Sequence, residues 1–147
     1  RSSDLKNTNS ELMVSHLLNG LITHILTDKN DETSDLKNIG LEKMEQIKNY
    51  LDESYQKKVS LDLIAEKFYI SKYHMAREFK KWYGITILNY IIAKRITHAK
   101  GLLRFTDMHI EEIAQECGID DNSYFNKLFR KIENTTASEY RKKWREN

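Results

Sequence analysis

A segment of this chain occurs twice, about fifty residues apart. The first copy, at 79–90, reads FKKWYGITILNY, and the second, at 129–140, reads FRKIENTTASEY. In both copies Phe is followed by two basic residues, then by a turn-forming Gly or Asn, a Thr and a final Tyr. Upstream, LIAEKFYIS at 63–71 corresponds to EIAQECGID at 112–120. Each copy therefore combines a short helix, a tight turn and a longer helix, which is the layout of a helix-turn-helix unit.

Small residues mark the crossing point and the turn of each unit. Ala65 and Ala114 lie inside the short helices, where a second helix can cross closely, and Gly118 stands where the turn requires a positive φ. We place the two units at about 61–82 and 110–132. A repeat of this length is also typical of helical solenoids, but a solenoid needs about three or more repeats to form a continuous core. Only two are present here, so we favour two helix-turn-helix units.

The composition favours an all-α fold. The 147 residues include no proline and only 5 glycines, which favours long helices over β structure. The single cysteine, Cys117, excludes an internal disulfide and fits a reducing cytosol. No apolar run is long enough for a membrane span, so we expect no membrane as a partner. The chain begins with Arg rather than Met, which we interpret as an internal cut or a processing site.

We expect a seven-helix domain over 41–147. Ser60, Ser71 and Thr86 are predicted N-caps because each directly precedes an apolar periodic segment. Thr136 has capping-box spacing to the glutamate three residues later. The predicted helices cover 41–53, 61–67, 72–82, 87–104, 110–117, 122–132 and 137–145.

The helix at 87–104 is the expected link between the two units. About 18 residues at ~1.5 Å each span roughly 27 Å, comparable with the ~34 Å of one duplex turn. Gly101 is the weak point of this helix. Its apolar side chains are expected to pack against both units; they are Leu88, Ile91, Ile92, Ala99, Leu102 and Leu103.

Residues 1–40 are expected to lie outside this domain and to be the remnant of a sensing or dimerisation domain. Residues 11–27 predict an additional N-terminal helix, whereas the polar stretch 28–38 predicts a linker. The helix could pair with a second copy to form a homodimer, dock on its own domain, or be left exposed by the cut. Its apolar stripe consists of Val14, Leu17, Leu18, Leu21, Ile22 and Ile25.

The longer helix of each unit has one apolar and one polar face. The inward residues are expected to be Met75, Phe79 and Trp82 in the first unit and Phe125, Phe129 and Ile132 in the second. The outward residues are Lys72, Tyr73, Ala76, Arg77 and Lys80, and Asn122, Ser123, Asn126, Lys127 and Arg130. Basic and amide side chains one turn apart suit base edges in a major groove. The basic pairs Lys80–Lys81 and Arg130–Lys131 suit phosphates.

From about Met44 to Arg141 the chain resembles the DNA-binding domain of AraC/XylS-type bacterial transcription regulators. The matching pieces are SLDLIAEKFYISKYHMAREFKKWYGIT, NYIIAKRITHAKGLL, IEEIAQECGIDDNSYFNKLFRK and EYR. The resemblance implies seven helices, with the third and sixth as recognition helices. It also implies double-stranded DNA and RNA polymerase as partners, no cofactor, and a cytoplasmic, nucleoid-associated location.

The resemblance extends the set of expected contacts. Base contacts are expected from Tyr73, Ala76, Arg77, Asn122, Ser123, Tyr124, Asn126 and Lys127, and phosphate contacts from Lys72, Lys80, Lys81, Arg130 and Lys131. The second unit is expected to read bases less than the first. The chain departs from the family pattern in its turns: Tyr69 and Asn134 stand in place of Gly, and Ile87 and Ala137 in place of Pro.

Other kinds of site have little support in the sequence. The histidines are scattered, and no Cys or carboxylate set accompanies them with metal-ligand spacing. We find no phosphate-binding glycine loop and no nucleophile–base motif, so we expect neither a metal site nor an enzyme. The alternative to DNA binding is a helical protein-interaction module whose basic faces bind an acidic partner.

Overall fold

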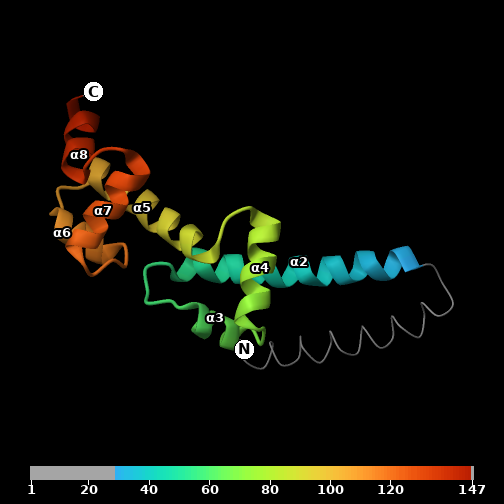
Figure 1. The fold of residues 1–147 in the computed structure, drawn as a ribbon. Helices are drawn as coiled ribbons and strands as arrows, with labels where there is room; N and C mark the ends of the chain where they lie inside the picture. Colours follow the sequence, from blue (N-terminus) through green and yellow to red (C-terminus); the bar gives the residue numbers. More distant parts are fainter. Residues whose placement is uncertain (1–28, 147) are drawn as a thin grey trace.

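The computed structural model describes residues 29–146, which form seven helices (Figure 1). No strand occurs within this range. The helices are α2 (Lys29–Ser54), α3 (Leu61–Lys67), α4 (Lys72–Tyr83), α5 (Ile87–Phe105), α6 (Ile110–Glu116), α7 (Asn122–Glu133) and α8 (Ala137–Glu146). The predicted all-α class and helix order are confirmed. The predicted helix at 11–27 lies outside the described residues.

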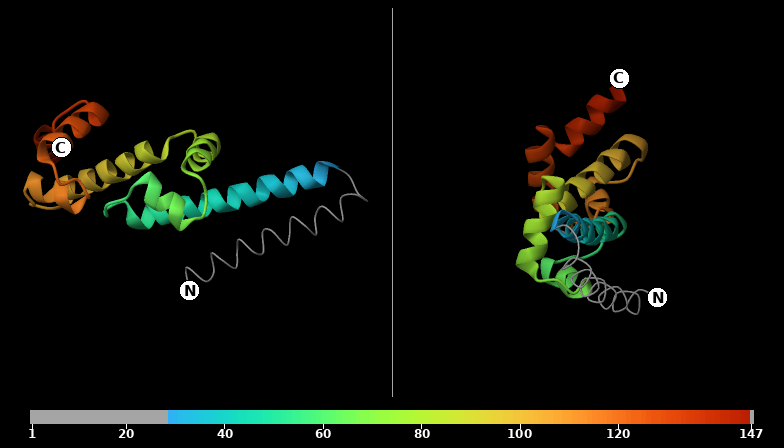
Figure 2. Two further views of the ribbon diagram at one scale, coloured as in Figure 1. Left: turned by 60° about the horizontal axis from the view of Figure 1, so that its bottom comes forward. Right: turned by 90° about the vertical axis from the view of Figure 1, so that its right-hand side faces the viewer.

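Two separate cores are built on one long helix. The first core joins residues of α2, α3 and α4 to Ile87 and Ile91 of α5. The second joins residues of α6, α7 and α8 to Ile96, Ala99 and Leu103 of α5. Figures 1 and 2 show α5 running from one unit to the other. The 19 residues of α5 continue through Gly101 without a break, so the helix is about 28 Å long.

The repeated Phe and Tyr form the same contact in both units. The rings of Phe79 and Tyr90 meet edge to face with centroids 5.7 Å apart and planes at 69°. The rings of Phe129 and Tyr140 do the same at 5.6 Å and 70°. Phe79 and Phe129 are both fully buried. The repeat thus preserves a packing contact between the longer helix of each unit and the helix that follows it.

The predicted helix starts are confirmed by side-chain caps. The hydroxyls of Ser60, Ser71 and Thr86 accept hydrogen bonds from the backbone N–H three residues later, at 3.2, 3.1 and 3.2 Å. Thr136 accepts in the same way from Glu139, at 3.1 Å. Such caps satisfy N–H groups that the first turn of a helix leaves without partners.

The predicted linker at 28–38 is wrong for the described residues, because α2 begins at Lys29 and continues without interruption to Ser54. Figure 1 shows its first turns extending beyond α3 and α4. The polar composition of 28–38 predicted a linker wrongly because packing further along the chain stabilises the helix. Met44, Ile47 and Leu51 are fully buried and fix the second half of α2. A helix anchored in this way extends through polar residues at little cost, since most of them have adequate helix propensity.

Two side chains differ from the expected packing. Ile132, predicted to point inward, is 40% exposed. Its counterpart Trp82 is larger and packs partly against the first core, whereas isoleucine at this end of the helix does not reach the second. Leu88, expected to pack against the units, is 51% exposed because Ile87 and Ile91 occupy the inner side of α5.

Candidate nucleic-acid interface

The first unit has a turn of four residues, 68–71, between α3 and α4. Ile64 and Ala65 are buried where the helices cross, and the N–H of Ile70 donates to the carbonyl of Ala65 at 3.0 Å. Tyr69 adopts a left-handed conformation with φ of 54°. This backbone conformation costs a non-glycine residue about 1–2 kcal/mol. The Tyr69 side chain is 53% exposed, so it recovers little of that cost by packing.

Helix α4 presents its predicted reading face to solvent. Met75 on its opposite face is fully buried. Tyr73 is 76% exposed, and Arg77 is exposed one turn later, while the small Ala76 between them is half-buried. The structure therefore brings Tyr73, Ala76 and Arg77 to one accessible face, as predicted.

The basic residues of α4 flank this face. Lys80 and Lys81 are exposed in the last turn. Lys72 lies in the first turn and forms an ion pair with Asp62 at 3.2 Å, with its ammonium 5.7 Å from the centroid of the Tyr73 ring. Asp62 is mostly exposed, and ion pairs of this kind are weak. Lys72 can therefore exchange this carboxylate for a phosphate at little cost.

The second unit has a turn of five residues, 117–121. Cys117 is fully buried, and burial raises the pKa of its thiol to about 12. Cys117 therefore behaves as a small apolar residue of the second core. Gly118 has φ of 92°, and a Cβ on it would lie 2.6 Å from the backbone oxygen of Gln56. Only glycine fits here without distortion, both for conformation and for space.

Helix α7 repeats the division of faces seen in α4. Phe125 is fully buried, like Phe129 four residues later. The predicted contact residues are accessible: Asn122 is half-buried, and Ser123, Tyr124, Asn126, Lys127, Arg130 and Lys131 are exposed. Asp121 is the N-cap and accepts from the N–H of Tyr124 at 3.1 Å. A carboxylate stands here where the first unit has the Ser71 hydroxyl.

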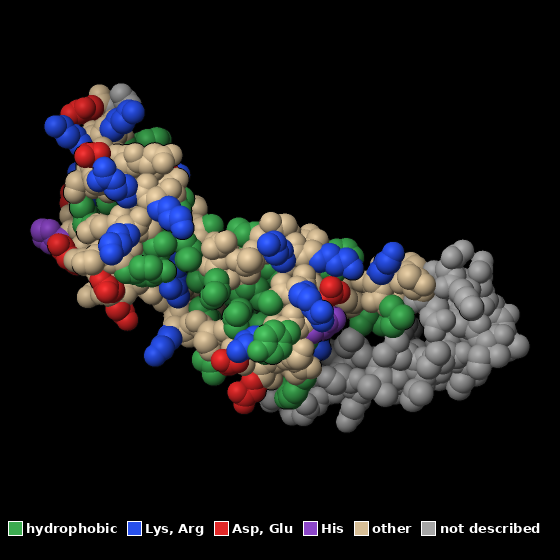
Figure 3. Space-filling model, in the orientation of Figure 1, with side chains coloured by type: hydrophobic (Ala, Val, Ile, Leu, Met, Phe, Trp, Pro, Cys, Tyr) green, Lys and Arg blue, Asp and Glu red, His purple; other side chains and the backbone are tan. Residues whose placement is uncertain are grey.

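The two units differ in charge although their folds match. Between Leu61 and Tyr83 there are five lysine or arginine residues and three acidic ones. Between Ile110 and Glu133 there are three basic and six acidic residues. Figure 3 shows lysine and arginine side chains on one face over the region of α4, and again over the region of α7 and α8. Over these two ranges, anions are therefore attracted more strongly to the first, while α8 adds Arg141, Lys142, Lys143 and Arg145 beside the second.

Known proteins share this arrangement of helices. The sequence profile of a family described as a helix-turn-helix domain matches residues 64–143. A solved structure from Chromobacterium violaceum, described as a transcriptional regulator with an AraC-type DNA-binding domain, has 25% identity and a TM-score of 0.64. The match covers 71% of this chain and 93% of that one. This chain belongs to the AraC family.

Two further similarities come from other bacteria. The C-terminal domain of the two-component response regulator yesN from Fusobacterium nucleatum has 36% identity and a TM-score of 0.64 to this AraC-family chain, covering 66% of it and 95% of the yesN domain. The transcriptional regulator YijO of Escherichia coli is 37% identical over 68% of this chain, which is 35% of YijO. The chain thus spans about a third of the length of the curated relatives it matches.

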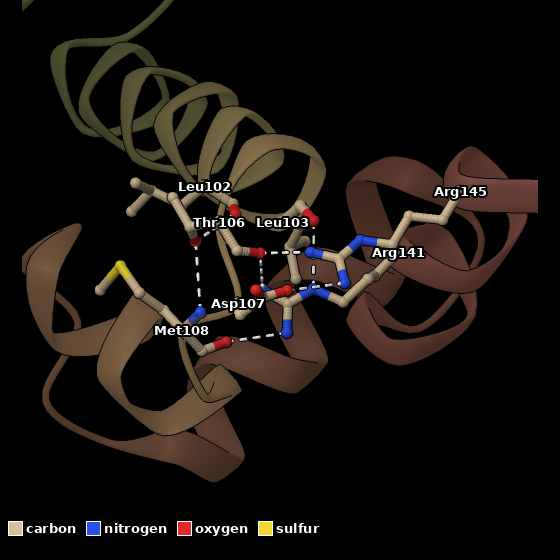
Figure 4. A network of polar contacts seen from close by, with 7 residues as sticks. All are labelled: Leu102, Leu103, Thr106, Asp107, Met108, Arg141 and Arg145. Carbon is tan, nitrogen blue, oxygen red and sulfur yellow. Dashed lines mark hydrogen bonds and ion pairs between the residues drawn. The ribbon is translucent and has the colours of Figure 1, made fainter.

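Arg141 holds the second unit of this AraC-family fold together, and our sequence reasoning did not assign it a role. Its guanidinium donates to three carbonyls at and after the end of α5: Leu103 in the last turn at 3.1 Å, Thr106 at 3.2 Å and Met108 at 2.7 Å (Figure 4). Arg145 also donates to the carbonyl of Thr106. Arg141 is the last residue of the EYR piece that resembles the family pattern. This resemblance was the sequence signal that could have pointed to its role.

Asp52 of α2 is a second polar contact that the sequence did not reveal. It accepts a hydrogen bond from the Tyr90 hydroxyl, and Lys48 and Lys94 each lie 3.3 Å from it. Burial raises the pKa of Asp52, but the hydrogen bonds from Tyr90, Lys94 and Lys48 outweigh burial and hold the pKa below its usual value. The Tyr that ends the first repeat therefore also ties α5 to α2.

Residues 29–146 contain neither a membrane-spanning helix nor a cluster of metal-binding side chains. No described helix is long and apolar enough to cross a membrane. The same residues contain no group of three or more His, Cys, Asp or Glu side chains that could hold a metal ion.

Proposed function

We propose that this chain is the DNA-binding part of a bacterial transcription regulator, with α4 and α7 entering successive major grooves on one side of a duplex. The observation that carries the proposal is the pair of exposed recognition faces on matched helix-turn-helix units joined by α5. The length of α5, about 28 Å, suits units that bind about one duplex turn apart, which is ~34 Å. Membership of the AraC family supports the same function.

The proposed contacts follow from chemistry and position. Arg77 can donate two hydrogen bonds to guanine, Asn122 or Asn126 can pair with adenine, and the methyl group of Ala76 can contact thymine. Tyr73, Ser123, Tyr124 and Lys127 lie on the same exposed faces and complete the base-reading set. Phosphates would be held by Lys72, Lys80, Lys81, Arg130 and Lys131.

Selection of sites from a random duplex pool tests this proposal and supplies the unknown operator. We expect enrichment of one motif with two recognisable halves about one helical turn apart. Affinity for it should fall steeply with salt, with a slope of about −0.9 for each phosphate neutralised. If the selected duplex and a scrambled duplex bind equally well, the chain does not read sequence.

The alternative is a basic helical module that binds an acidic protein. It predicts salt-dependent binding to acidic polypeptides as strong as binding to DNA, and no enrichment of a duplex motif. Polyglutamate and the selected duplex, compared in one competition assay, separate these two functions.

A longer regulator that contains this chain would bind partners besides DNA. Because the chain spans about a third of its relatives, we propose that residues 1–40, which include the first turns of α2, lead from a preceding sensing or dimerisation domain. RNA polymerase is the expected protein partner of the bound regulator, and a non-catalytic role is expected, in line with YijO being named a transcriptional regulator. A homodimer through residues 11–27 would appear in sedimentation as a dimer that deletion of residues 1–28 converts to a monomer.

A further inference from the structure

The loop after α2 connects the two units in addition to α5. The buried residues that α5 gives to the first core end at Ile91 and those that it gives to the second begin at Ile96, with the half-buried Ile92 packed against the second core. A single helix between two bodies can bend and twist, so it does not by itself fix their relative orientation. Residues 55–57, which leave the end of α2 in the first unit, lie beside this middle stretch of α5 and beside the turn of the second unit.

Arg95, in the middle of α5, holds this loop. Its Nε donates to the carbonyl of Tyr55 at 2.6 Å, and its Nη2 donates to the carbonyl of Lys57 at 2.9 Å. Burial lowers the pKa of Arg95, and this is opposed by the nearby Tyr124 and Asp120 of the second unit. A guanidinium remains charged in proteins, so both carbonyls keep a charged donor, which makes these hydrogen bonds stronger than neutral ones.

The loop in turn touches the second unit. His98 Nδ1 lies within hydrogen-bond distance of two polar groups of the loop, 3.1 Å from the Tyr55 hydroxyl and 3.2 Å from Gln56 Nε2. Gln56 Nε2 also donates to the carbonyl of Glu116, at the end of α6, at 3.4 Å. The backbone of Gln56 lies so close to Gly118 that a Cβ there would be 2.6 Å from its oxygen.

We propose that Tyr55, Gln56, Lys57, Arg95 and His98, which we name the clamp, fix the rotation of one helix-turn-helix unit relative to the other and so set the spacing of the two DNA half-sites. The inference rests on the proposed function. Inserting one base pair between half-sites moves the second by about 3.4 Å and turns it by roughly 35°. A rigid pair of units loses contacts on such a duplex, whereas a loosely joined pair follows the shifted groove.

The test compares Arg95→Gln with Arg141→Gln. Both variants remove an arginine that holds backbone carbonyls, but Arg141 acts within the second unit only. Each protein is titrated against the selected duplex and against duplexes with one base pair inserted or deleted between the halves. We expect wild type and Arg141→Gln to lose about tenfold or more in affinity on the altered spacing. Arg95→Gln should lose less than about threefold on the same duplexes.

A second variant covers the case in which Arg95→Gln does not fold. Tyr55→Phe combined with Gln56→Ala keeps the arginine but removes the side-chain contacts to His98 and to Glu116. It should give an intermediate loss of spacing discrimination. Spin labels at Glu66→Cys and Glu112→Cys, one in each short helix, should report a wider distance distribution in the clamp variants than in wild type or Arg141→Gln.

Equal spacing discrimination in wild type and in either folded clamp variant, with equally narrow label distances, would overturn the role of the clamp. A similar loss of discrimination in Arg141→Gln would mean that general destabilisation is responsible, which also overturns it. Failure of wild type to prefer any duplex contradicts the proposed function instead. The label distances still decide in that case whether the clamp restrains the units.

Discussion

The two helix-turn-helix units share their packing but not their surfaces. The edge-to-face Phe–Tyr contact has nearly the same geometry in both, and Ala65 and Ala114 are buried at equivalent crossings. In contrast, the turns contain four and five residues, and the balance of charges reverses between the units. A sequence repeat therefore reports what each core requires, whereas exposed positions are free to diverge.

The largest expected difference between the units is in the free energy of unfolding, after substitution of the turn residue that has a positive φ. Gly118→Ala should destabilise the protein by about 3 kcal/mol, since a left-handed alanine costs about 1–2 kcal/mol and crowding against the Gln56 backbone adds about 1–3 kcal/mol. Urea denaturation measures the free energy of unfolding. Tyr69→Ala is the matched control and should change it by less than about 1 kcal/mol, because the tyrosine is already left-handed and half exposed. Similar losses in both variants would mean that Gln56 readily moves aside.

The next comparison is between the contributions of the exposed faces of α4 and α7 to DNA affinity. Arg77→Ala should lower affinity for the selected duplex by about 1–3 kcal/mol and relax preference at one base pair. Lys127→Ala should cost less than about 1 kcal/mol, because the second unit carries more acidic than basic residues and attracts DNA less. Fluorescence anisotropy against single-base variants of the duplex measures both, with Lys37→Ala on the exposed start of α2 as control. A larger effect at Lys127 than at Arg77 would reverse the assigned importance of the units.

Most of the fold followed from the sequence, because helix starts and core periodicity are local signals. The caps at Ser60, Ser71 and Thr86 are fixed by residues three positions away. The error at 28–38 arose because a polar stretch was judged by its composition alone, while α2 is anchored by burial of Leu51 and its neighbours further along the chain.

The clamp could not be predicted from the sequence. Arg95 contacts backbone carbonyls 38 and 40 residues away. Every residue has a backbone carbonyl, so the residue types at those positions do not indicate the contact. The reading faces were easier, since helical spacing alone places Tyr73 and Arg77 on one side. Their exposure is confirmed, and their contacts with DNA stay a prediction.

A smaller effect is expected from relieving strain in the first turn. Tyr69→Gly should stabilise the protein by about 1 kcal/mol, because removing the left-handed penalty of about 1–2 kcal/mol exceeds the entropy cost of glycine, about 0.5–1 kcal/mol. Removing the Tyr69 side chain subtracts little from this gain in stability, because the residue is 53% exposed. Thermal unfolding should show a higher midpoint than in Tyr69→Ala. A lower midpoint would indicate that the Tyr69 ring packs more favourably than its exposure suggests.

The smallest expected effect concerns the carboxylates before α7. Asp120 is exposed and does not cap the helix, since Asp121 does, so Asp120→Asn should change DNA affinity without unfolding the turn. One unit charge about 10 Å from a phosphate in water contributes about 0.4 kcal/mol, so affinity should rise about twofold at low salt. The gain should vanish at about 0.5 M salt, where the screening length is shorter than this distance. Glu42→Gln on α2 removes the same charge far from α7 and should have a smaller effect. If Asp120→Asn weakens binding, the carboxylate accepts a hydrogen bond from a base rather than repelling phosphate, and the second unit reads sequence through an acidic residue.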